Sequence, residues 1–95
     1  IVYKTTPQDK LSEDFKTKLQ KGDFDGVMFF SSETAKIFCN LLKKEAMESS
    51  TKNLYAFCLS NKIAKTIKNY GFKATIYPKN PTMVAIIKLL VTFRF

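Results

Sequence analysis

The feature that most constrains the fold is a regular alternation between continuous apolar runs and segments with helical periodicity. The runs at 25–30 and 53–59 show little alternation of polar and apolar residues. This pattern is typical of strands that are covered on both faces, as in parallel sheets. Between the runs, apolar residues recur every three or four positions, as on one face of a helix. Strands separated by helices predict right-handed strand-helix-strand units, so we expect an α/β fold with a mostly parallel sheet and flanking helices.

The remaining strands are expected to be short. Residues 2–5 favour a strand or linker that ends before Pro7. Residues 72–77 alternate between apolar and polar side chains, which is typical of a strand near the edge of a sheet.

Helices are expected after each polar residue that can cap a helix. The first follows Asp9 or Ser12, the second follows Ser31 or Ser32, the third follows Ser60 and Asn61, and the last starts at Asn80-Pro81 or at Thr82. Their predicted buried faces comprise Leu11, Phe15 and Leu19, then Ala35, Phe38, Leu41 and Leu42, then Ile63, Ala64, Ile67 and Tyr70. The last helix, at 83–90, is apolar nearly all round, so we expect it to be largely buried.

The charge and the residue types limit the chemistry. Sixteen Lys and Arg residues against eight Asp and Glu give a formal net charge of +8, which attracts polyanions in general. The single arginine, Arg94, disfavours sequence-specific reading of DNA. With no His and no phosphate-binding glycine loop, we expect no metal, no nucleotide and no His general base.

The cysteines and the hydropathy bear on localisation. Cys39 and Cys58 lie inside apolar stretches, so we expect free, buried thiols in a reducing compartment. No apolar run approaches the length of a membrane span, and the N-terminal residues do not resemble a secretory signal. We therefore expect a soluble, cytoplasmic protein.

The turns that follow the strands are the best candidates for a binding site. In open parallel sheets, ligands lie beyond the carboxyl ends of the strands. Here these ends are 30–32, 59–62 and 77–80, and each leads into a helix N-terminus, which favours anions. Together with Lys62 and Lys79, their hydroxyls would form a shallow site for carboxylates or phosphates. Taken singly, each hydroxyl is more often a cap and each lysine a solvated charge, so it is their convergence on one edge that favours a site.

The amino-acid sequences of several segments resemble those of the uroporphyrinogen-III synthase family. The segments are Tyr3-Lys4-Thr5, Phe24-Asp25-Gly26-Val27-Met28-Phe29-Phe30-Ser31-Ser32 with Phe38, Tyr55 to Ser60, Ile63-Ala64-Lys65, Tyr70-Gly71-Phe72 and Pro81-Thr82-Met83. The resemblance covers nearly all 95 residues but corresponds only to the C-terminal portion of the family. It implies a flavodoxin-like, HemD-type lobe that is incomplete, because the N-terminal strand-helix unit and the second lobe are absent. Residues 1–7 would be the inter-lobe linker strand and 8–95 the C-terminal part of the first lobe.

The resemblance also implies an activity. Members of the family are cofactor-free lyases of tetrapyrrole and heme biosynthesis that cyclise hydroxymethylbilane, a polycarboxylate, to uroporphyrinogen III with inversion of the last pyrrole ring. The linker tyrosine, proposed to assist departure of the hydroxyl, corresponds to Tyr3. The substrate-binding positions correspond to Ser31, Ser32, Ser60, Asn61, Lys62 and Thr82. Lys62 and Ile63 stand where the family often has two threonines, which puts those hydroxyl contacts in doubt.

Two further expectations and two alternatives accompany this interpretation. The chain alone should be inactive, and an open sheet edge should recruit a second copy or a swapped element. One alternative is a non-enzymatic flavodoxin-like domain that binds polyanions or nucleic acid. Its nucleic-acid form is disfavoured because the aromatic residues mostly lie in predicted strands or on apolar faces, as do Phe29, Phe30, Phe38 and Phe57. A receiver-like domain would need an Asp where Ser31 or Ser60 follows a strand.

Overall fold

The computed structural model describes residues 2–5 and 11–93 and contains a four-stranded sheet whose neighbouring strands are all parallel. In spatial and sequence order, the strands are β1 (Val2–Lys4), β2 (Gly26–Phe29), β3 (Tyr55–Cys58) and β4 (Ala74–Ile76). The α-helices are α1 (Glu13–Gln20), α2 (Ser32–Lys44), α3 (Asn61–Thr66) and α4 (Met83–Thr92). The short 3-10 helices η1 (Glu48–Asn53) and η2 (Lys68–Tyr70) precede β3 and β4. The predicted α/β fold with a parallel sheet is confirmed.

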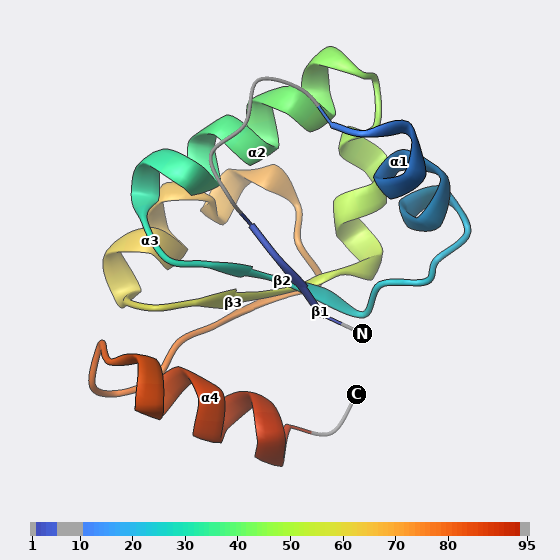
Figure 1. The fold of residues 1–95 in the computed structure, drawn as a ribbon. Helices are drawn as coiled ribbons and strands as arrows, with labels where there is room; N and C mark the ends of the chain where they lie inside the picture. Colours follow the sequence, from blue (N-terminus) through green and yellow to red (C-terminus); the bar gives the residue numbers. More distant parts are fainter. Residues whose placement is uncertain (1, 6–10, 94–95) are drawn as a thin grey trace.

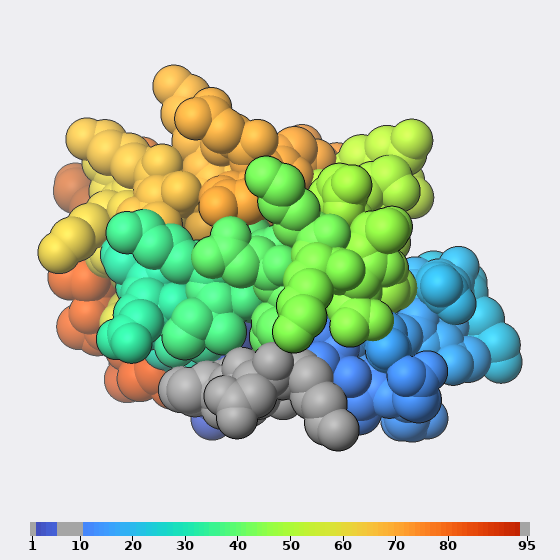
Figure 2. Space-filling model, turned by 90° about the horizontal axis from the view of Figure 1, so that it is seen from above, coloured from blue at the N-terminus to red at the C-terminus, as the bar shows by residue number. Residues whose placement is uncertain are grey.

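The helices form a layer on each face of the sheet. α1, α2 and α3 each connect two adjacent parallel strands, and right-handed crossovers in a sequential order place all three on the same face. Figure 1 shows these helices above the sheet and α4 below it. Seen from above, α2 crosses the middle of the helical face between α3 and α1 (Figure 2). Because the strands are parallel, the loops that follow them lie along one edge of the sheet.

The two central strands contribute to a hydrophobic core on each face. The core under α1, α2 and α3 includes Val27, Phe29, Ala56 and Cys58. On the other face, Met28 and Phe57 pack with Ile86 of α4. Both faces of β2 and β3 are therefore buried, which explains the continuous apolar runs of these strands.

The first two helices begin where their capping residues predict. Ser12 Oγ accepts a hydrogen bond from the Phe15 amide, and Ser31 Oγ accepts one from the Thr34 amide, each at 3.1 Å. The alternative first cap, Asp9, lies outside the described residues. The predicted stripe of Leu11, Phe15 and Leu19 is buried, as expected for the inner face of α1.

The expectation that the last helix would be largely buried is wrong. Ile86 is fully buried, but Met83, Val84, Ile87 and Val91 are 46%, 63%, 48% and 73% exposed. Among the described helices, α4 alone lies on this face of the sheet (Figure 1). Only the side of α4 that points toward Phe57 is therefore covered.

No helix within residues 2–5 and 11–93 is long and apolar enough to cross a membrane.

Candidate functional site

The candidate site lies at the edge formed by the carboxyl ends of the parallel strands. The predicted binding residues follow β2, β3 and β4 along this edge, at Ser31 and Ser32, at 60–62 and at Thr82. The structure distinguishes those that stabilise helices from those that line an open hollow.

Ser31 is engaged in stabilising α2. Its Oγ accepts a hydrogen bond from the Thr34 amide at 3.1 Å and lies 2.8 Å from Thr34 Oγ1. The neighbouring Ser32 Oγ lies 3.4 Å from Thr66 Oγ1 of α3, whose shorter contact is with the Lys62 carbonyl at 2.9 Å. Ser31 therefore stabilises the start of α2, whereas Ser32 supports the packing of α2 against α3.

Thr82 likewise acts as a helix cap. Its Oγ1 accepts a hydrogen bond from the Ala85 amide at 3.1 Å and satisfies one of the free donors at the start of α4. Its hydroxyl supports the helix that covers the second face of the sheet.

Ser60, Asn61 and Lys62 lie together in a hollow of about 450 Å³. The hollow is completed by Tyr77, Pro78, Lys79 and Pro81 from the loop between β4 and α4. Ser60 occupies the N-cap position of α3, but its side chain makes no capping hydrogen bond, so the prediction that this hydroxyl caps the helix is wrong. Its hydroxyl is therefore not committed to α3, unlike those of Ser31 and Thr82 to their helices.

The hollow combines positive charge with apolar walls. Lys62 and Lys79 are exposed, no acidic residue lines the hollow, and within the described part of the chain neither lysine forms a salt bridge. Tyr77 is 44% exposed and adds an aromatic surface to the lining of the hollow. These side chains suit an anion attached to an apolar body.

The sequence predicted that Lys79 lies at the carboxyl ends of the strands. It did not predict that Tyr77, Pro78 and Pro81 line the same hollow. The only signal was the spacing Tyr-Pro-Lys-Asn-Pro after the alternating segment 72–77. That spacing identifies a rigid loop, because each proline fixes its own backbone angle. It does not reveal which way the loop folds.

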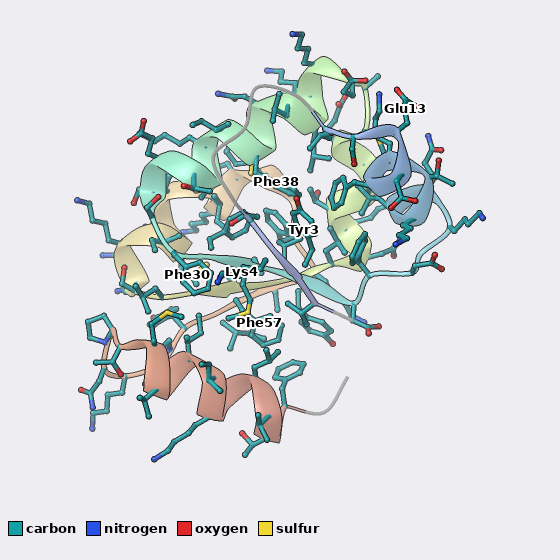
Figure 3. All side chains as sticks on the ribbon, viewed as in Figure 1. Tyr3, Lys4, Glu13, Phe30, Phe38 and Phe57 are labelled. Atoms are coloured by element: carbon teal, nitrogen blue, oxygen red, sulfur yellow. The ribbon has the colours of Figure 1, made fainter. Side chains whose placement is uncertain are left out.

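Tyr3, the predicted catalytic residue, lies in an aromatic cluster on the helical side of the sheet. Its ring centroid is 4.4 Å from that of Phe15, 5.6 Å from Phe24 and 6.3 Å from Phe38. Figure 3 shows Tyr3 beside Phe38, with Phe57 on the α4 side. Tyr3 lines a separate hollow of about 400 Å³ between β1 and α1, away from the one that Lys62 lines.

A third hollow, of about 480 Å³, lies at the opposite edge of the sheet. It is lined by Lys43 at the end of α2 and by residues of η1 and η2, including Thr51 and Tyr70. These elements precede β3 and β4, so this hollow lies at the amino ends of the strands, away from the edge where parallel sheets bind ligands.

The cysteines and acidic residues do not form a reactive centre in the described residues. Burial raises the pKa of Cys39 and of Cys58 to about 12, which disfavours the nucleophilic thiolate. No group of three or more His, Cys, Asp or Glu side chains within 2–5 and 11–93 could hold a metal ion.

Comparison with known proteins identifies a family. The family model described as uroporphyrinogen-III synthase HemD matches residues 1–88 of the chain. Searches of curated proteins and of solved structures found no match.

Proposed function

The chain belongs to the uroporphyrinogen-III synthase (HemD) family, which acts in tetrapyrrole biosynthesis, and on this premise we propose that it cyclises hydroxymethylbilane to uroporphyrinogen III. The reaction would remove the hydroxyl and close the macrocycle with inversion of the last pyrrole ring, as a lyase. We propose no cofactor, because loss of water and ring closure require no net oxidation or reduction. The observation that carries the proposal is the cationic hollow lined by Ser60, Lys62 and Lys79 at the carboxyl edge of the sheet.

The hollow provides what such a reaction needs from a protein. A flexible polycarboxylate must be held so that the unfavoured ring carbon attacks, which is a problem of positioning. Lys62 and Lys79 would hold carboxylate arms, and Ser60 would donate a hydrogen bond to one of them. Fixed donors also stabilise the charge that develops as hydroxide departs.

The catalytic role of Tyr3 is carried by the family resemblance. Its ring packs against Phe15 and Phe24, so the residue also has a structural role. Tyr3→Phe keeps the ring and removes only the hydroxyl. If the hydroxyl assists departure of the leaving group, this variant slows turnover while the free energy of unfolding stays unchanged.

A homodimer or swapped element through a sheet edge also remains a proposal. β1 and β4 are the outermost strands and present backbone groups at the edges. Light scattering of the purified chain over a range of concentrations tests this, and a monomer mass throughout would contradict it.

The test of the function is a stopped assay with hydroxymethylbilane that separates the type I and type III isomers. It is run on the chain alone and on the longest polypeptide that contains it. We expect an excess of type III product over the spontaneous type I background from the longer polypeptide, and little from the chain alone. Only type I product from a folded polypeptide would refute the synthase proposal and leave the non-enzymatic polyanion-binding alternative.

A further inference from the structure

The hollow at the amino ends of the strands is lined by charges of both signs. We infer that it is a second ligand site, which binds a small zwitterion, namely a free α-amino acid with an apolar side chain. Lys43 and Lys52 hold the carboxylate of this ligand, and Glu48 holds its ammonium group. The inference does not rest on the proposed function, because this hollow shares no residue with the one lined by Lys62.

The charged side chains of this hollow are not paired with one another. Lys43 lies in the last turn of α2, whereas Glu48 and Lys52 lie on η1. All three residues are exposed, and the salt bridges within residues 2–5 and 11–93 involve Lys16 and Lys18 instead. Opposite charges that line one hollow without contacting each other suit a ligand that carries both charges.

The end of α2 disfavours a simple anion as the ligand. The carboxyl end of an α-helix carries a partial negative charge, which attracts cations and repels carboxylates and phosphates. Lys43 belongs to the last turn of this 13-residue helix. A ligand therefore gains most when its ammonium group lies near Glu48 and the helix end, and its carboxylate lies at the tips of the two lysine side chains.

The floor of the hollow is fixed by hydrogen bonds between η1 and η2. Thr51 is only 3% exposed, and its Oγ1 lies 2.9 Å from the Glu48 carbonyl and 2.7 Å from the Tyr70 carbonyl. Gly71 follows η2 with a φ of +77°, and a Cβ at this position would lie 3.6 Å from Thr51 Oγ1. The glycine thus permits the left-handed turn and leaves the space beside Thr51 open.

Tyr70 and the volume limit the size and type of the ligand. The ring of Tyr70 is partly buried against the core under α1, α2 and α3, and its remaining surface lines the hollow. An apolar side chain that packs on this ring removes apolar area from water. The volume of about 480 Å³ lies within the roughly 300–1,000 Å³ of small-molecule sites. An amino acid with an aromatic side chain therefore fits.

The experiment separates the two charges of the ligand. The probe is L-phenylalanine, and it is compared with N-acetyl-L-phenylalanine, which lacks the ammonium group, and with L-phenylalaninamide, which lacks the carboxylate. Binding to the full chain is followed by amide chemical shifts in nuclear magnetic resonance. The variants are Glu48→Gln, Lys43→Gln and Lys52→Gln. Lys44→Gln is the matched control, because Lys44 is an exposed lysine of the same helix turn and does not line the hollow.

We expect L-phenylalanine to bind more tightly than either derivative and to shift the amides of 48–52 and 69–71. Each of the three variants should weaken its binding about two- to fivefold, as is typical of losing an exposed ion pair. Glu48→Gln should not weaken binding of the N-acetyl derivative, and the two lysine variants should not weaken binding of the amide, because each derivative lacks the group concerned. Lys44→Gln should leave all three affinities unchanged.

Four results would overturn the inference. No binding of L-phenylalanine refutes the site, and equal or tighter binding of the N-acetyl derivative indicates a site for simple anions. Shifts at 60–62 and 77–79 instead place the ligand in the other hollow. An equal loss in Lys44→Gln indicates attraction by net charge alone. The isomer assay is independent, because type III product without amino-acid binding refutes only this inference, and binding without type III product refutes only the synthase proposal.

Discussion

Replacing Gly26 with alanine should force the two central strands apart. Gly26 is buried in β2 and lies opposite Tyr55 of β3 in the parallel register. A Cβ built on Gly26 would lie 2.6 Å from the Tyr55 carbonyl oxygen and 3.1 Å from a ring carbon of Phe57. In folded proteins, Cβ atoms essentially never approach a non-bonded atom closer than 3.0 Å. Because the carbonyl belongs to the paired strand, the contact is relieved only by moving backbone.

These contacts determine how much Gly26→Ala lowers the free energy of unfolding. Overpacking a close-packed core costs typically about 1–3 kcal/mol. Gly26→Ala should reach the upper end, about 3 kcal/mol, because the obstacle is backbone rather than the end of a flexible side chain. Gly22→Ala is the matched control. A Cβ at Gly22 meets nothing within 4 Å, and its φ of +77° costs only the left-handed strain of about 1–2 kcal/mol.

The assay is urea unfolding of the wild type and both variants, followed by circular dichroism. A domain of this size has a total stability of about 5–14 kcal/mol, so a loss of about 3 kcal/mol shifts the midpoint clearly. Gly26→Ala should lose distinctly more stability than Gly22→Ala. If Gly22→Ala lost as much or more, the close approach of β2 to β3 would be refuted.

Three further predictions test the packing, the caps and the thiols. Thr5→Val should cost about 1 kcal/mol in urea unfolding, because it removes a buried hydroxyl that donates to a β2 carbonyl at 2.6 Å; no loss would contradict that bond. Ser31→Ala should also cost about 1 kcal/mol, whereas Ser60→Ala should leave stability within error, and equal losses would contradict the difference in capping. Burial raises the pKa of Cys39 and Cys58 from 9.0 to about 12. The free energy of unfolding should therefore fall as the pH rises from about 9 towards 12, because in this range the two thiols ionise in the unfolded chain but not in the folded one. Alkylation at pH 8 should require unfolding, and rapid labelling of the native chain would refute the burial.

The sheet could be predicted because a strand that is buried on both faces consists of a continuous run of apolar residues. Val27 and Phe29 point to one core while Met28 points to the other, so β2 contains no polar position. The first helix was equally clear, because the buried Phe15 and Leu19 lie one turn apart.

Other features escaped prediction because they depend on what packs nearby. The polar segment of η1 buries Thr51, whose hydroxyl lies 2.7 Å from the Tyr70 carbonyl, nineteen residues away. No periodicity of apolar residues within a segment predicts a contact between residues so far apart in the sequence. For α4, the apolar residues on all sides predicted burial, yet Val84 and Val91 are exposed, because only one side of the helix meets the sheet. Composition reports how much apolar surface a helix carries, but the neighbouring elements decide how much of it is covered.

In the candidate site too, the sequence gives the residue types, but the surrounding structure decides which hydrogen bonds their side chains make. Ser31 and Ser60 each follow a buried strand and precede a helix, so the sequence presents them as equivalent caps. The structure distinguishes them, because Ser31 Oγ accepts a hydrogen bond from the Thr34 amide, whereas the Ser60 side chain makes no capping hydrogen bond to α3. As a proposed binding group, a hydroxyl that caps no helix and lies beside Lys62 and the exposed Tyr77 would cost the fold little to provide. It follows that substitutions at Ser60 should change ligand affinity without changing stability, and that substitutions at Ser31 should change stability first.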